Sequence, residues 1–289
     1  LIHWNGKQWT EDTSVDSSYT MAIGGVDANN VWIVCDYGEM FYYNGVGWTP
    51  VTNTLTEEGV SMRKFFATAT DNLWVVDNNG RAHSYDGVLW GRHGFLEEQD
   101  AVVTHVWATS SDDVWATVFE GLLLHYRGTE WRLHTSRGAS RLDVVHGASA
   151  SEAWAIGDVL LEYDGSSWTL LEDLSTIAES GTFIGIHGDS STEVQTMLST
   201  GNVYEWDGGS FSQIASVPDY VYLSDAHFLG IDDAWAVGQV GAILYWNGNI
   251  LYQFEGLTAN YLLTVFAAPD GHAFAGGYGG TVLHYDPTR

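Results

Sequence analysis

Short hydrophobic runs separated by polar turns follow one another along the whole chain. Many runs end in an aromatic residue followed by Asn-Gly or Asp-Gly, pairs typical of two-residue β-hairpin turns because they tolerate a positive φ. This motif, or a close variant of it, begins at Trp4, Tyr43, Tyr85, Tyr126, Tyr163, Trp206, Trp246 and Tyr285. No segment keeps the 3.6-residue period of an amphipathic helix, so the pattern predicts an all-β chain.

A second set of markers, mostly bulky aromatic residues, lies upstream of the turns. It comprises Trp32, Trp74, Trp115, Trp154, Gln195, Trp235 and Phe274. A further large residue, such as Trp48 or Trp90, follows most of the turns. The markers recur about every 40 residues, a spacing within the range of propeller blades.

Each repeat is interpreted as four short antiparallel strands, which we call a, b, c and d and which together form one propeller blade. The chain is therefore predicted to be a single seven-bladed β-propeller, with the tryptophans filling the space between blades. The expected blades span about residues 19–51, 60–93, 101–134, 141–171, 182–214, 221–254, and 261–289 together with 7–12.

The two ends of the chain indicate how the ring closes. Strand c has a copy at each end, whereas strands a and b are complete in seven units. We expect the N-terminal strand around residues 7–10 to complete the last blade as its strand d, hiding two sheet edges. Residues 1–5 would then be redundant, either displaced or part of a preceding segment, and the start within a repeat suggests a processed or incompletely represented parent chain.

Residues 112–131 carry the pattern Asp-Asp-Val-Trp-Ala, then Gly, Leu-Leu-His-Tyr, Gly and Trp. This pattern resembles the propeller repeats of secreted proteins and lipoproteins of environmental bacteria, distant relatives of the kelch, Asp-box and WD-repeat propellers. The resemblance covers essentially the whole chain and implies a secreted or cell-surface location. It specifies the fold more than the function, because such repeats support many activities.

The net charge of the chain limits the classes of partner that it is expected to bind. Asp and Glu number 37 against 10 Lys and Arg, giving a net charge of −27 at pH 7. Nucleic-acid binding depends on clustered basic residues, so neither a nucleic acid nor an anionic membrane is expected as a partner. No apolar run is long enough to predict membrane insertion. The single cysteine, Cys35, excludes an internal disulfide and a cysteine-based zinc site.

Propeller topology divides the loops between two faces. The a–b and c–d turns share an acidic, regular face, and the b–c hairpins and d–a connections share the other. We call the second the variable face, because its loops differ from blade to blade and such loops usually carry binding sites.

Exposed aromatic and polar residues of the variable face form a candidate ligand platform. Aromatic rings would stack on a sugar while carboxylates and amides bond its hydroxyls; the alternative is that these are ordinary loop residues. The candidate residues are Tyr37, Phe119, Tyr278, Asp36, Asn78 and Gln239.

Four arginines fall within a short segment, at Arg127, Arg132, Arg137 and Arg141. The last two flank a d–a connection on the variable face. They are candidates for anchoring a carboxylate or sulfate, since the guanidinium fork matches such groups. Pairing with nearby acidic residues is the alternative.

The acidic turns and the histidines of strand a can each be interpreted either as structural or as metal-binding residues. The acidic turns could form weak Ca²⁺ sites, but Asp and Asn also begin turns through their side chains. His146, His187 and His227 share one position of strand a, where other blades have Phe66 or Trp107. This position is interpreted as packing between blades, and no metal site is predicted.

No catalytic motif of the known spacings is found. The chain is therefore predicted to be a non-catalytic binding module of a secreted or cell-surface bacterial protein, with a glycan or a protein as its ligand and no required cofactor. The alternative is a glycan-active hydrolase or lyase that uses the variable face, because paired carboxylates leave no spacing signature.

Overall fold

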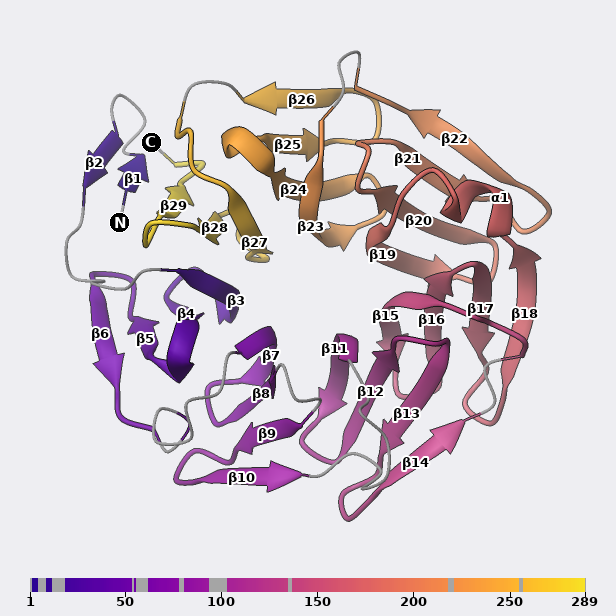
Figure 1. The fold of residues 1–289 in the computed structure, drawn as a ribbon, viewed down its shortest axis with the longest axis horizontal. Helices are drawn as coiled ribbons and strands as arrows, with labels where there is room; N and C mark the ends of the chain where they lie inside the picture. Colours follow the sequence, from indigo (N-terminus) through magenta and orange to yellow (C-terminus); the bar gives the residue numbers. More distant parts are fainter. Residues whose placement is uncertain are drawn as a thin grey trace.

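Seven sheets, one for each repeat, stand in a ring around a central channel (Figure 1). The structure is a computed structural model that describes the chain except for residues 1, 5–8, 12–18, 54, 56–61, 78–80, 94–102, 135–136, 218–220, 255–256 and 289. For strands β1 and β2 and for Tyr37 it describes the backbone alone. None of the helices in the described part is long and apolar enough to cross a membrane.

The first six blades each consist of four antiparallel strands in sequence order, with strand a nearest the channel. The first three are β3 (Thr20–Asp27), β4 (Asn30–Cys35), β5 (Met40–Tyr43) and β6 (Trp48–Val51); β7 (Met62–Ala69), β8 (Asn72–Asp77), β9 (Ala82–Tyr85) and β10 (Trp90–His93); and β11 (Val103–Ser110), β12 (Asp113–Val118), β13 (Leu122–Tyr126) and β14 (Trp131–His134). The next three are β15 (Leu142–Ser149), β16 (Glu152–Gly157), β17 (Val159–Tyr163) and β18 (Trp168–Asp173); β19 (Phe183–Ser190), β20 (Glu193–Leu198), β21 (Val203–Trp206) and β22 (Phe211–Ala215); and β23 (Leu223–Gly230), β24 (Asp233–Gly238), β25 (Ile243–Trp246) and β26 (Leu251–Phe254).

The last blade contains both ends of the chain. Its strands are β27 (Leu262–Ala267), β28 (Ala273–Gly277), β29 (Val282–Tyr285), β1 (Ile2–Trp4) and β2 (Trp9–Glu11). Short helices lie on the connections: α1 (Ser175–Ala178), η1 (Asp36–Gly38) and η3 (Gln239–Gly241). The prediction of a seven-bladed propeller closed by the N-terminal segment is confirmed.

The order of the closing strands differs from the prediction. The neighbour of β29 is β1, which runs parallel to it with Ile2 opposite Leu283, whereas β2 is the fifth and outermost strand. The strand-c copy that forms β1, at residues 2–4, is therefore not redundant. The reason lies in the pairing of β1 with β2, which places Trp4 opposite Trp9 in the register that the c and d strands have in the other blades. The two strands join the sheet together, through the edge of β1.

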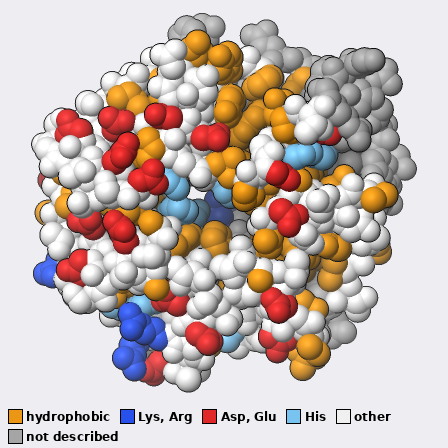
Figure 2. All heavy atoms as spheres, turned by 180° about the vertical axis from the view of Figure 1, so that it is seen from behind, with side chains coloured by type: hydrophobic (Ala, Val, Ile, Leu, Met, Phe, Trp, Pro, Cys, Tyr) orange, Lys and Arg blue, Asp and Glu red, His pale blue; other side chains and the backbone are white. Residues whose placement is uncertain are grey.

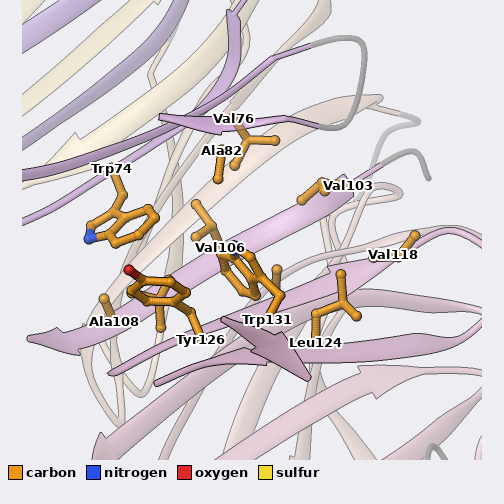
Figure 3. Packing of buried hydrophobic residues seen from close by; sticks show 12 residues of the cluster. Trp74, Val76, Ala82, Val103, Val106, Ala108, Val118, Leu124, Tyr126 and Trp131 are labelled. Atoms are coloured by element: carbon orange, nitrogen blue, oxygen red, sulfur yellow. The ribbon is translucent and has the colours of Figure 1, made fainter. Parts of the chain in front are cut away.

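The tryptophans pack between neighbouring blades, as expected from the repeat. Trp74 of the second blade contacts Tyr126 and Trp131 of the third, with ring centroids 5.3 and 6.1 Å apart (Figure 3). Trp115 repeats the arrangement one blade further on, against Tyr163 and Trp168. Because each marker side chain is buried against the next blade, these contacts hold the ring together.

Gln195 stands where most other blades have tryptophan, and it joins two blades by hydrogen bonds instead. Its amide nitrogen donates to Glu205 Oε2 at 2.8 Å and to Asp232 Oδ1 at 2.7 Å. Its oxygen accepts from the backbone N–H of Asp232 at 3.0 Å and from Trp246 Nε1 at 3.1 Å. The buried amide is thus fully bonded, which is the condition for placing a polar group in a core.

Candidate binding site at the mouth of the channel

A β-bulge interrupts strand a near its start in all seven blades. In each blade the pairing with strand b skips one residue, the second of strand a. A bulge leaves the extra residue unpaired and redirects its side chain. The seven bulge residues are Met21, Arg63, Thr104, Asp143, Ile184, Ser224 and Leu263, and all of them line one hollow of about 460 Å³ at the mouth of the channel.

Tyrosines form one side of this mouth. Tyr222 and Tyr261 line the hollow, and Tyr261 stacks on Tyr278 with ring centroids 5.4 Å apart. Tyr278 in turn meets Tyr19 edge to face at 4.9 Å. Tyr19 and Tyr278 remain 41% and 45% exposed, so their rings are available to a ligand. We call Tyr19, Tyr222, Tyr261 and Tyr278 the tyrosine group.

Two of the predicted polar residues hold the tyrosine group in place. Asp36 Oδ1 accepts from the backbone N–H of Tyr19 at 3.3 Å, and Gln239 Nε2 donates to the hydroxyl of Tyr261 at 3.2 Å. The structure thus brings Tyr278, Asp36 and Gln239 to one region of the variable face, spread over the last two blades and the first.

The remaining predicted platform residues lie elsewhere or outside the described residues. Phe119 is 58% exposed on the turn between β12 and β13 of the third blade, and no ring contact joins it to the tyrosine group within the described part. The backbone of Tyr37 lies in η1, but its side chain is not described. Asn78 is outside the described residues.

The two candidate anchoring arginines bond to the protein itself. Arg141 forms a fork with Asp143, with Nε to Oδ1 at 2.8 Å and the terminal nitrogen to Oδ2 at 2.7 Å, and this pairing raises the pKa of Arg141. It also donates to the carbonyl oxygen of Gly181 at 2.9 Å. Arg137 donates to the carbonyl oxygen of Trp168 at 2.7 Å.

An ion pair crosses the channel below the mouth. Lys64 Nζ of the second blade lies 3.1 Å from Asp225 Oδ1 of the sixth, and these blades are not neighbours in the ring. The other oxygen, Oδ2, accepts from the backbone N–H of Val265 at 3.0 Å. Because both side chains are largely buried, the pair narrows the channel and forms the floor of the mouth.

Histidines line the channel beyond this ion pair. In Figure 2 histidine side chains lie at the central opening and a basic side chain lies deeper within it. The ring of His146 lies 5.1 Å from that of His187 and 5.7 Å from that of Trp107. Burial lowers the pKa of His146 to about 3 and that of His227 to about 4. The side-chain rings of Trp107, His146 and His187 therefore pack in a row along this side of the channel.

The acidic turns of the opposite face use their side chains to bond backbone. Asp86, Asp164 and Asp207 each accept hydrogen bonds from two backbone N–H groups of their own turn. These bonds lower the pKa of the Asp86 and Asp207 carboxyls. The pKa of the Asp164 carboxyl is lowered most by the hydrogen bond from the Ser166 side chain and further by the backbone bonds. Such bonding is the mechanism by which Asp begins a turn. Within the described residues no three His, Cys, Asp or Glu side chains gather as a metal site would require, and weak Ca²⁺ binding stays a prediction.

The sequence interpretation overlooked Tyr19, Tyr222 and Tyr261. All three occupy one repeat position, directly before strand a, in blades that become consecutive once the ring closes. Arg141 holds the same position in the fourth blade. The repeat position directly before strand a, compared from blade to blade, carries the signal for these three tyrosines.

No protein-family model and no curated protein matches the chain. Solved structures do match its fold. A streptogramin B lyase superimposes with a TM-score of 0.76 at 10% identity, over 94% of each chain. YCF48 from Cyanidioschyzon merolae gives 0.71 at 16% identity, over 96% of this chain and 98% of that one. A structure of YCF48 bound to D1 peptide gives 0.70 at 15% identity, over 93% of each chain. These similarities show the fold alone.

Proposed function

We propose that this chain is a non-catalytic binding module of a secreted or cell-surface protein, and that it holds a polypeptide segment of a partner at the mouth of the channel. The tyrosine group carries the proposal. Tyrosines offer large contact area with a hydroxyl at the edge, and they lose little conformational entropy on binding, which is why they are enriched at protein interfaces.

The shape of the region fits a segment better than a flat partner surface. The mouth is a hollow of about 460 Å³ lined by one bulge residue from every blade, and two of the tyrosines border it. A hollow of this size takes a few side chains, and the exposed rings beside it would cover the neighbouring residues of the segment. A structure of similar fold, YCF48, has been solved with a peptide bound, which supports the capacity of such a ring to hold one.

The carboxyl groups of the mouth favour binding over hydrolysis. Asp143 is paired with Arg141, and Asp225 with Lys64. A general acid needs a carboxyl whose pKa is raised toward neutrality. Among the described residues, burial raises the pKa of the carboxyls of Glu162 and Asp233, and neither lines the mouth. A glycan-active hydrolase or lyase on this face remains the alternative function.

Selection from a displayed library of random peptides tests the proposal. We expect the protein to enrich peptides, and Tyr278→Ala to weaken their binding by about tenfold or more, the typical effect of truncating an aromatic anchor. Tyr252→Ala is the matched control, because Tyr252 is similarly exposed but lies on the outer strand β26. A glycan array probed in parallel addresses the other ligand class. Binding of glycans without any enriched peptide would contradict the proposal, and bond cleavage in a bound glycan would support the alternative.

A further inference from the structure

The ring of bulge residues differs chemically from blade to blade. It contains apolar side chains, hydroxyls, one carboxylate and one guanidinium, all directed into the same hollow. The β-bulge occurs in all seven blades, whereas the side chain at the bulge differs between blades. The ring can therefore distinguish ligands by the chemistry that faces each blade.

Arg63 is the free charge of this ring. The other ionised bulge residue, Asp143, is neutralised by Arg141. Every other described Lys or Arg interacts with another residue, such as Arg81 with Asp77 and Arg132 with Glu130. Arg63 has neither a hydrogen bond nor an ion pair within the described part. An exposed guanidinium without an internal partner is notable in a chain with 37 acidic and 10 basic residues.

A second cation lies next to it. Lys64 follows Arg63 in sequence and lines both the mouth and the channel below it. The Lys64 ammonium has three N–H donors, and Asp225 accepts from one of them. Lys64 therefore keeps N–H donors that Asp225 does not use, in the same hollow that Arg63 lines.

We propose that Arg63, supported by Lys64, receives one carboxylate of the polypeptide segment held at the mouth. This inference rests on the proposed function and specifies the ligand. The planar fork of a guanidinium matches the two oxygens of a carboxylate. The net charge of −27 repels a segment with many negative charges, so a single carboxylate on an otherwise neutral or basic segment fits best. That carboxylate is either the C-terminus of the segment or an Asp or Glu side chain.

Synthetic peptides distinguish these two sources. The probes are peptides enriched from a library displayed with free C-termini, each made in three forms: unchanged, amidated at the C-terminus, and with Asp and Glu replaced by Asn and Gln. We expect one of the two neutralised forms to bind about tenfold more weakly or worse, the scale of a charge-assisted hydrogen bond. Loss on amidation identifies the terminal carboxylate, and loss on Asp or Glu replacement identifies the side chain.

Variants assign the effect to Arg63. Arg63→Gln should weaken the unchanged peptide by about tenfold and should abolish the difference between the charged and neutralised forms. Arg132→Gln, an exposed arginine on the outer strand β14, is the matched control and should change nothing. If Tyr278→Ala weakens binding while neither Arg63→Gln nor neutralisation of the peptide does, the carboxylate inference is overturned and the proposed function stands. If no peptide is enriched, both are overturned.

Discussion

His146 gives the structure a pH dependence that one substitution should remove. Its ring is packed between Trp107 and His187 in the channel, at a position where the second and last blades have phenylalanine. Burial lowers the pKa of His146 to about 3, because a charged imidazole loses its hydration there. The change His146→Phe keeps a ring of similar size and removes the titrating group.

The sign and size of the effect follow from this pKa. In the unfolded chain a histidine titrates near pH 6.5, so between that pH and about 3 the unfolded state binds a proton that the folded state does not. The contribution of neutral His146 is complete above pH 6.5 and is lost as the pH falls toward 3. At pH 5 the loss is about 2 kcal/mol, from about 1.4 kcal/mol for each pH unit below the unfolded pKa.

Urea denaturation at pH 7.5 and pH 5 measures this difference. The free energy of unfolding of the wild-type chain should fall between the two pH values, and in His146→Phe the fall should be smaller by about 2 kcal/mol. Trp107→Phe is the control, because it alters the same arc of rings without removing a titrating group. Equal pH dependence in His146→Phe and the wild type would refute the reasoning.

Three further predictions concern stability. In urea denaturation, Gln195→Leu should lower the free energy of unfolding by about 1–3 kcal/mol, because it leaves the buried Trp246 N–H without an acceptor. This loss should be smaller when Gln195→Leu is made in a Trp246→Phe background, where that N–H is absent. Trp115→Ala should cost about 3–5 kcal/mol by the same assay, since the side chain is fully buried between two blades, and a cost below 1 kcal/mol would contradict the packing account. A double-mutant cycle of Lys64→Met and Asp225→Asn should give a coupling of about 1 kcal/mol, modest because both groups keep some contact with solvent; zero coupling would mean that the ion pair across the channel does not form in solution.

The repeat made the fold predictable because each blade is specified locally. Turn residues and the marker tryptophans lie within one repeat of each other, so the blade number follows from their spacing. The order of the closing strands was not predictable in this way. That order depends on whether β1 and β2 join the last blade separately or as a pair. The pairing of Trp4 with Trp9 keeps the two strands together, but in the sequence β1 is recognisable only as an extra copy of strand c.

The site was only partly predictable because its residues come from different blades. Tyr278 was identified from its exposed hairpin, but the rings it contacts, Tyr19 and Tyr261, precede strands in two different repeats. Lys64 and Asp225 come from two blades that are not neighbours in the ring, and no sequence spacing links them. Arg63 belongs to no sequence motif, and only the bulge in β7 shows that it faces the mouth.

Hydrogen–deuterium exchange with a bound, library-enriched peptide tests most directly whether the mouth of the channel is the binding site. The account predicts slower exchange at the backbone amides beside the mouth, in the segments that contain Tyr19, Tyr222, Tyr261 and Tyr278. Exchange at the turns of the opposite face, such as the one begun by Asp164, should stay unchanged. Protection confined to those turns, with none at the tyrosine group, would contradict the account.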